Sequence, residues 1–287
     1  MIGPMIGVLF DGFAYGMLLF LLSVGLSVTL GMMNFVNLAH CAFAMLGGYV
    51  TVTLMNSFNW PFFATLPFAF LAAALVSIVF ERLLYRRLYG ASDLDQVLLT
   101  IGLAFVAVAV AAYVYGTIQQ PVTMPGYLRG SVTIFGLTFG AYRLFLVGIA
   151  LVVTLLLVGM LEYTRFGATV RAAVDNQRMA RGLGINVDGA FALTFALGSG
   201  LAGLGGALAI EIVGLDPSFA FTYLIYVLIV VSVGGLGSIG GSFAAATLIG
   251  ISDVAGKYYV PHLGAFLIYL VMVVLLMWRP AGLFGKR

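Results

Sequence analysis

Long uninterrupted apolar runs constrain this chain more than any other feature, and one extends from Leu144 to Leu161. In lipid such a segment must satisfy its own backbone hydrogen bonds, which a helix does. The strands of a membrane barrel would instead alternate apolar and polar residues. Charged residues make up only 8% of the chain, against about 25% in soluble domains, so they could not cover a water-facing surface. The sequence therefore predicts an all-α, polytopic integral membrane protein.

Apolar segments follow one another along the whole chain. They cover residues 6–30, 38–55, 61–80, 96–117, 142–161, 189–213, 221–235, 241–255 and 263–278. A full crossing needs about 20 residues. The pair 221–235 and 241–255 is shorter, with the sequence GGLGSIGG between its members, and forms either two tilted spans or discontinuous half-helices. We expect eight or nine transmembrane helices in a single domain over residues 1–287.

Basic residues gather in three polar stretches, 81–93, 162–188 and 279–287, which hold ten of the 13 Lys and Arg. Short loops rich in Lys and Arg remain on the cytoplasmic side of a membrane. We therefore predict that these three stretches, the C-terminus included, are cytoplasmic. The segment 118–142 would then lie outside, and so would the N-terminus if every apolar segment crosses.

The longest polar stretch, Glu162 to Asp188, predicts a short helix from Gly167 to Arg181. Arg171, Asp175 and Arg178 share one face of this helix, at spacings where opposite charges pair. The stretch is either a solvated basic loop or a rigid knob that docks into a groove of a partner. Small residues line the opposite face: Thr169, Ala173 and Ala180.

The sequence also predicts where this helix ends and where the next one begins. Gly182 and Gly184 are expected to break the helix. Asn186 or Asp188 can then cap the next helix, because a side-chain oxygen at that position accepts a hydrogen bond from a free backbone N–H.

Two interruptions of the apolar sequence are candidate parts of a substrate path. Paired breaks in the two halves of a transporter point to such a path, because half-helix ends offer free N–H and C=O groups. The alternative is structural: the asparagines cap or link helices, and the histidine is a hydrogen-bonded packing residue. The candidate path residues are Asn34, Asn37, His40, Gly234, Gly235, Gly237, Ser238 and Gly240.

Three charged residues outside the basic stretches have expected places. Asp253 and Lys257 stand at i and i+4 and should pair. Asp11 would be costly inside lipid, so we expect it at the membrane interface.

Several classes of function are excluded. GGLGSIGG lacks the Lys-Ser/Thr that a phosphate-binding loop needs, so we expect no ATP hydrolysis by this chain. No nucleophile–base pair is visible, and one cysteine with two scattered histidines makes no metal site. We predict that the chain is not an enzyme, holds no metal or cofactor itself, and has no nucleic-acid partner.

Five blocks of the sequence resemble one family. They are GMMNFVNLAHCAFAMLGGYV, LLTIGLAF, the run from EYTRFGATV to GLGGAL (162–208), VGGLGSIGGSFAAATLIG and RPAGLFGK. In this order, over nearly the whole chain, they resemble the branched-chain amino acid ABC-transporter permeases of the LivH type.

The resemblance implies the membrane subunit of a high-affinity, binding-protein-dependent ABC importer in the bacterial inner membrane, with the ABC-importer permease fold. It implies four kinds of partner: a second homologous permease, two cytoplasmic ATPases that bind ATP and Mg²⁺, a periplasmic binding protein and membrane lipid. It also implies that 162–188 contains the coupling helix that sits on an ATPase. The residues carried over are Arg165, Gly167, Arg171, Asp175, Arg178 and Gly184.

This chain departs from the family pattern at three positions. The family usually has Gly and Glu where Cys41 and Ala42 stand, and often Pro where Gly240 stands. The missing carboxylate leaves the substrate open. The expected substrate is a branched-chain or other amino acid, and urea or a short-chain amide is the alternative substrate. An ion-coupled secondary transporter and a membrane scaffold are the remaining readings.

Overall fold

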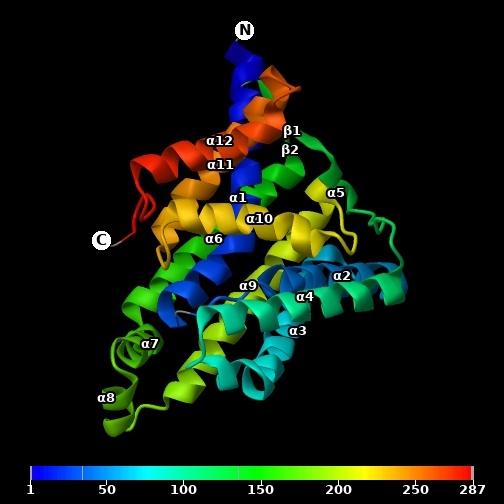
Figure 1. The fold of residues 1–287 in the computed structure, drawn as a ribbon. Coiled ribbons are helices and arrows are strands. Elements are labelled where there is room, and N and C mark those ends of the chain that lie inside the picture. The colour runs from blue at the N-terminus through cyan, green and yellow to red at the C-terminus, as the bar shows by residue number, and fades with distance from the viewer. Residues whose placement is uncertain (1, 34, 135, 286–287) are drawn as a thin grey trace.

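The computed structural model of the protein describes residues 2–33, 35–134 and 136–285. The chain is almost entirely helical, with one short two-stranded hairpin (Figure 1). In chain order the elements are α1 (Ile2–Met33), α2 (His40–Phe58), α3 (Phe62–Leu83), the 3-10 helix η1 (Tyr85–Leu88), α4 (Asp93–Tyr115), α5 (Gly126–Arg129), β1 (Ser131–Ile134), β2 (Leu137–Gly140), α6 (Ala141–Tyr163), α7 (Arg165–Asp175), α8 (Gln177–Gly182), α9 (Val187–Val213), α10 (Phe219–Gly234), α11 (Ile239–Tyr259) and α12 (Gly264–Trp278).

Within these ranges, seven helices are long and apolar enough to cross a membrane: α1, α2, α3, α4, α6, α9 and α11. The apolar helices α10 and α12 are shorter. The prediction of an all-α, multi-pass membrane protein is confirmed. Of the eight or nine expected membrane segments, seven are long enough to cross in the part of the chain that the structure describes, and α10 and α12 are shorter apolar helices.

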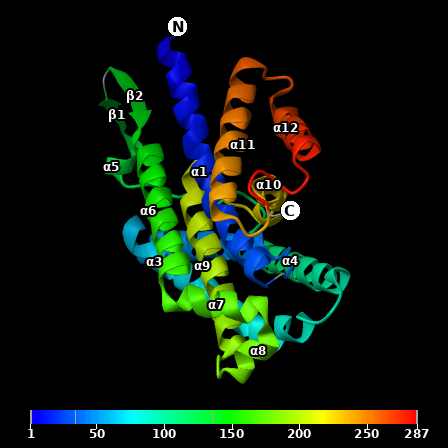
Figure 2. The same cartoon turned by 90° about the vertical axis from the view of Figure 1, so that its left-hand side faces the viewer.

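Helices α1 and α9 form the buried centre of the molecule (Figure 2). Glycines let their neighbours approach closely, as small residues do in membrane bundles. A Cβ at Gly25 of α1 would lie 2.0 Å from the carbonyl oxygen of Gly198 in α9. One at Gly47 of α2 would lie 2.2 Å from the carbonyl oxygen of Gly203. The core is therefore built from direct backbone contacts as much as from large side chains.

Helices α4, α6 and α12 lie at the periphery, and they expose large apolar side chains. Leu98 on α4, Leu155 on α6 and Met277 on α12 are examples. In water these helices would expose a large apolar surface without a partner. Their exposed side chains are therefore compatible with contact to lipid.

The three basic stretches meet at one end of the bundle, which we call the basic end. Arg86, between α3 and α4, pairs with Asp188 at the start of α9. The tail after α12 joins the C-terminus of α10, since Leu283 N–H donates to the carbonyl of Val233 at 2.7 Å. Helix α1 begins at the opposite end, where Asp11 pairs with Arg143 at the start of α6.

Helix α1 starts at the end opposite the basic one and runs toward the basic end (Figure 2). Residues 118–142 hold α5 and a hairpin whose turn includes Gly136 with φ +79°. Two details add to or differ from the sequence-based expectations. Helix α11 has 21 residues, enough for a full crossing. The helix predicted over 167–181 is in fact two helices.

Candidate functional site

Helices α7 and α8 project from the basic end (Figure 1). The predicted single helix is broken at Asn176, which has extended backbone angles, φ −154° and ψ 92°. Its side chain accepts a hydrogen bond from Met179 N–H at 2.9 Å and so caps α8. An asparagine that offers this cap competes with helix continuation, which explains why one helix became two.

The predicted ion pairs of this segment are wrong. Among the residues that the structure describes, four ion pairs form, and none includes Asp175. Arg171 instead donates to the carbonyl of Leu161 at the end of α6. That carbonyl also lies against Gly167, where a Cβ would approach it to 1.9 Å. Arg171 and Gly167 therefore attach α7 to α6, while Arg178 stays exposed.

The small face of this segment packs inside the chain. Ala173 and Ala180 are buried with Val187 and Phe191 of α9. These two alanines therefore contribute to packing within the chain, and docking of this segment on a partner stays a prediction. We call the projecting part formed by α7, α8 and the turn up to Asn186 the tip. Its exposed apolar side chains are Met179 and Leu183, and the backbone turns beyond them at Gly184, with φ +81°.

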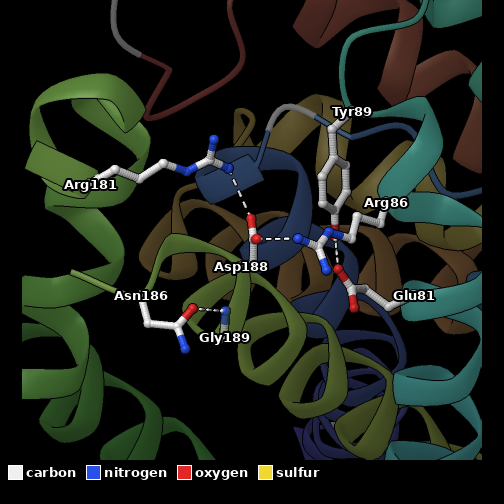
Figure 3. Close-up of polar contacts among 7 residues, drawn as sticks. All are labelled: Glu81, Arg86, Tyr89, Arg181, Asn186, Asp188 and Gly189. Atoms are coloured by element: carbon white, nitrogen blue, oxygen red, sulfur yellow. Dashed lines mark hydrogen bonds and ion pairs between the residues drawn. The ribbon is translucent and has the colours of Figure 1, made fainter. Parts of the chain in front are cut away.

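A polar network braces the tip against α3 and η1 (Figure 3). Asp188 accepts from Arg181 at 2.9 Å and also from Arg86. Beside it, Tyr89 donates to Glu81 at 2.7 Å. Burial and this hydrogen bond raise the pKa of Tyr89 well above its ordinary value, so the phenol remains a donor. These contacts join residues about one hundred positions apart in the chain into one unit.

Asn186 caps α9, accepting from Gly189 N–H at 2.9 Å. Of the two caps left open by the sequence, Asn186 forms and Asp188 takes the ion-pair role (Figure 3). Arg165 is exposed at the start of α7, and its place in an ATPase-coupling loop stays a prediction.

The first interruption lies between α1 and α2, and helix α4 satisfies its backbone. Gln96 accepts from Val36 N–H at 3.0 Å, and Thr100 accepts from Leu38 N–H at 3.1 Å. The sequence reasoning missed both residues. Their spacing of i and i+4 in an otherwise apolar helix was the available signal, since such polar residues link helices in membranes.

The predicted path residues of this interruption are buried. Asn37 is 1% exposed and accepts from Ala39 N–H at 3.0 Å. His40 is 1% exposed, with Nε2 3.0 Å from the carbonyl oxygen of Leu22. Asn34 lies outside the described residues. Neither Asn37 nor His40 lines the two polar cavities that are described below. A contact between these side chains and a substrate stays a prediction.

The second interruption, residues 235–238, is a tight turn between α10 and α11. Gly235 and Gly237 have φ +94° and +78°, which favour glycine. Ser238 caps α11 by accepting from Gly241 N–H at 3.0 Å. The tail covers the last turn of α10, where Leu283 and Phe284 N–H groups donate to the carbonyls of Val233 and Gly234.

A cavity of about 1020 Å³ opens beside this turn, and we call it the inner cavity. Gly237, Ser238 and Gly240 line it together with Glu162 and Arg171. Gly31, at the end of α1, touches the same turn, since a Cβ there would lie 1.9 Å from Gly237 Cα. The structure thus brings residues of the second interruption, of the polar stretch 162–188 and of the end of α1 around one space.

Comparisons with known proteins agree with one another. The family model for the permease component of the branched-chain amino acid transport system matches residues 8–276. The high-affinity branched-chain amino acid transport system permease protein BraD of Pseudomonas aeruginosa is 25% identical, over 97% of this chain and 95% of its own length. The probable branched-chain amino acid transport permease protein LivH of Methanocaldococcus jannaschii is 28% identical, over 94% and 90%.

A second type of permease is also similar. The high-affinity branched-chain amino acid transport system permease protein LivM of Escherichia coli is 26% identical, over 93% of this chain and 68% of its own length. No solved structure gives a significant match. Since the family model covers nearly the whole chain, the chain belongs to the permease-component family of the branched-chain amino acid transport system.

Proposed function

We propose that this chain is the membrane-spanning permease subunit of an ABC importer for branched-chain or other apolar amino acids. Residues 1–287 would form one permease domain in a bacterial inner membrane, with the basic end in the cytoplasm, as the bias of Lys and Arg favours. The observation that carries the proposal is that α7 belongs both to the projecting tip and, through Arg171, to the wall of the inner cavity.

This double position offers a mechanical link. A protein bound to the tip that shifts α7 would move the end of α6, because Arg171 and Gly167 hold the Leu161 carbonyl. The ion pairs of Asp188 would hold α8 and the start of α9 together with η1, and Ala173 packs α7 on the same start of α9, so that these elements would move together. A displacement of the tip would therefore be transmitted to the wall of the inner cavity through packed helices and not through flexible loops.

The partners follow from this arrangement. Two ATPases would bind ATP and Mg²⁺, and one of them would dock on the tip of this chain, with Met179 and Leu183 as exposed apolar contacts. A second, homologous permease would complete the membrane pair, and the existence of LivH- and LivM-named relatives supports this. A periplasmic binding protein would deliver the substrate at the end opposite the basic one. The chain itself would bind no cofactor and catalyse no reaction.

Reconstitution tests the proposal. The chain would be incorporated into liposomes with a partner permease, two ATPases and a binding protein, and uptake of L-leucine, urea and acetamide measured. We expect uptake of L-leucine that requires ATP, and none by the chain alone. Uptake by the lone chain along an ion gradient would overturn the proposal, and ATP-dependent uptake of urea or acetamide in place of L-leucine would overturn its substrate.

Docking of the ATPases is tested separately. Arg178→Glu reverses an exposed charge on α8, so we expect about tenfold weaker association with the ATPases, since steering by complementary charge depends on such residues. Arg87→Glu is the matched control at the same end of the molecule. Equal co-purification of both variants with the ATPases would argue against α8 as the docking element.

A further inference from the structure

A second cavity, of about 290 Å³, opens at the end opposite the basic one, between α1, α6, α9, α10 and α11. We call it the outer cavity. Two acids, two bases and several tyrosines line it, among them Asp11, Tyr15, Arg143, Tyr223, Asp253 and Lys257. Its volume is near the lower limit of about 300 Å³ for small-molecule sites, which suits one small ligand.

Asp253 on α11 is the clearest sign of a binding site. The residue is only 2% exposed. One carboxylate oxygen, Oδ2, accepts from Lys257 Nζ at 2.7 Å, as the i, i+4 spacing predicted. The other oxygen, Oδ1, is buried and has no hydrogen-bond partner in the described structure. A buried carboxylate oxygen without a donor is unfavourable, so a donor from a ligand would stabilise it.

Arg143 faces the same cavity from α6. Its Nη1 pairs with Asp11, and the place of that acid at the membrane interface stays a prediction. A guanidinium has five N–H donors, and the side chain is 44% exposed, so donors are left for a carboxylate, the group that arginine binds in bidentate fashion. Lys257 Nζ lies 5.9 Å from the ring centroid of Tyr15, so aromatic faces also line the space.

The charge of the outer cavity selects the ligand class. Two carboxylates balance two cations, so the site has no formal charge and offers no advantage to a simple anion or cation. It does offer separated positive and negative groups, which match a zwitterion. Beside Thr222 and the tyrosines, the wall includes the aliphatic side chains of Ile212, Val213 and Val254.

We propose that the outer cavity binds an α-amino acid with an aliphatic side chain as its zwitterion. The ammonium group donates to Asp253 Oδ1, the carboxylate accepts from Arg143, and the side chain packs on Val213 and Val254. This inference rests on the proposed function, because it gives the substrate its first binding place on the permease. Helix α11 joins this place to the inner cavity, since its first residues line one and its last residues the other.

Equilibrium binding tests the inference. The purified full-length chain in lipid nanodiscs would be titrated with tritiated L-leucine. We expect saturable binding, competed by L-isoleucine and L-valine. 4-Methylpentanoate, which lacks the ammonium, and 3-methylbutylamine, which lacks the carboxylate, should each compete at least about tenfold more weakly, since each loses one charged hydrogen bond.

Variants assign the two ends of the ligand. Asp253→Asn should weaken L-leucine at least about tenfold and leave competition by 4-methylpentanoate unchanged, while Arg143→Gln should show the reverse preference. Val254→Phe fills the cavity without removing a charge and should abolish binding even if Asp253→Asn fails to fold. Ser252→Ala, at a half-buried neighbour on the same helix that does not line the outer cavity, is the matched control and should bind normally.

The results separate this inference from the proposed function. Absence of saturable L-leucine binding, or binding that withstands Val254→Phe, would overturn the outer site, even if the full importer takes up L-leucine with ATP. L-leucine binding that Val254→Phe abolishes and the two charge variants discriminate would support the site, even if no ATP-dependent uptake is found and the proposed function fails.

Discussion

The segment between α1 and α2 and the turn between α10 and α11 both interrupt membrane helices, but they are stabilised differently. Side chains of α4 bind the first segment, through Gln96 and Thr100. The second is a glycine turn held by backbone contacts with α1 and the tail, and it faces the inner cavity. Unpaired backbone groups are costly at membrane depth, so each interruption is satisfied in its own way.

This difference shows what polar residues and glycines each contribute. Asn37 and His40 use their polar atoms to bind nearby backbone in a buried place. The glycines of the turn remove side chains instead, which lets α1 approach and leaves a space. A polar residue in a membrane segment is therefore not sufficient evidence for a substrate contact, and an absent side chain can be the better sign of a cavity.

The largest loss of stability is expected from Gly31→Val, which would break the contact between α1 and the glycine turn 235–238. The new side chain would meet the backbone of Gly237, which cannot swing away, so we expect about 3 kcal/mol of destabilisation. Thermal unfolding followed by size-exclusion chromatography measures it. Gly240→Ala is the control, because nothing lies within 4 Å of a Cβ there. Equal stability of the two variants would contradict the close contact.

A smaller effect is expected from Gln96→Leu, which would break the support of the first interruption. It removes the acceptor of Val36 N–H and the donor to Leu88 carbonyl, and leaving a buried donor unpaired costs about 2 kcal/mol. Thermal unfolding again provides the measurement. Leu98→Ala, at an exposed position of the same helix, should change stability less. A stable Gln96→Leu variant would mean that the first interruption does not depend on α4.

The smallest effect on stability, and the sharpest test of the comparison, comes from Asn37→Ala and Ser238→Ala. Asn37→Ala removes the acceptor of the Ala39 N–H just before α2, and Ser238→Ala removes the cap of α11; each costs about 1 kcal/mol. Only Ser238 lines the inner cavity, so only Ser238→Ala should also lower ATP-dependent L-leucine uptake in the reconstituted importer. Equal uptake by the two variants would remove the functional distinction between the interruptions.

Much of the fold could be predicted from the amino-acid order. Apolar runs predict membrane helices because lipid demands internal hydrogen bonding, and basic loops predict a common end because their charges remain on one side. Local spacing also predicted the Asp253–Lys257 pair, since i and i+4 adjoin on any helix. The same spacing failed for Arg171 and Asp175, where a carbonyl of α6 and a break at Asn176 offered other partners.

The sequence by itself determined the class of the protein, its membrane segments, the common end of its basic stretches and the positions of its two interruptions. These depend on composition and on neighbours along the chain. Only the tertiary structure decided that Gln96 binds Val36, that Gly31 meets Gly237, and that Asp253 and Arg143 face one cavity. Those contacts join distant segments, and their geometry is set by how closely glycine-rich helices pack, which no local pattern records.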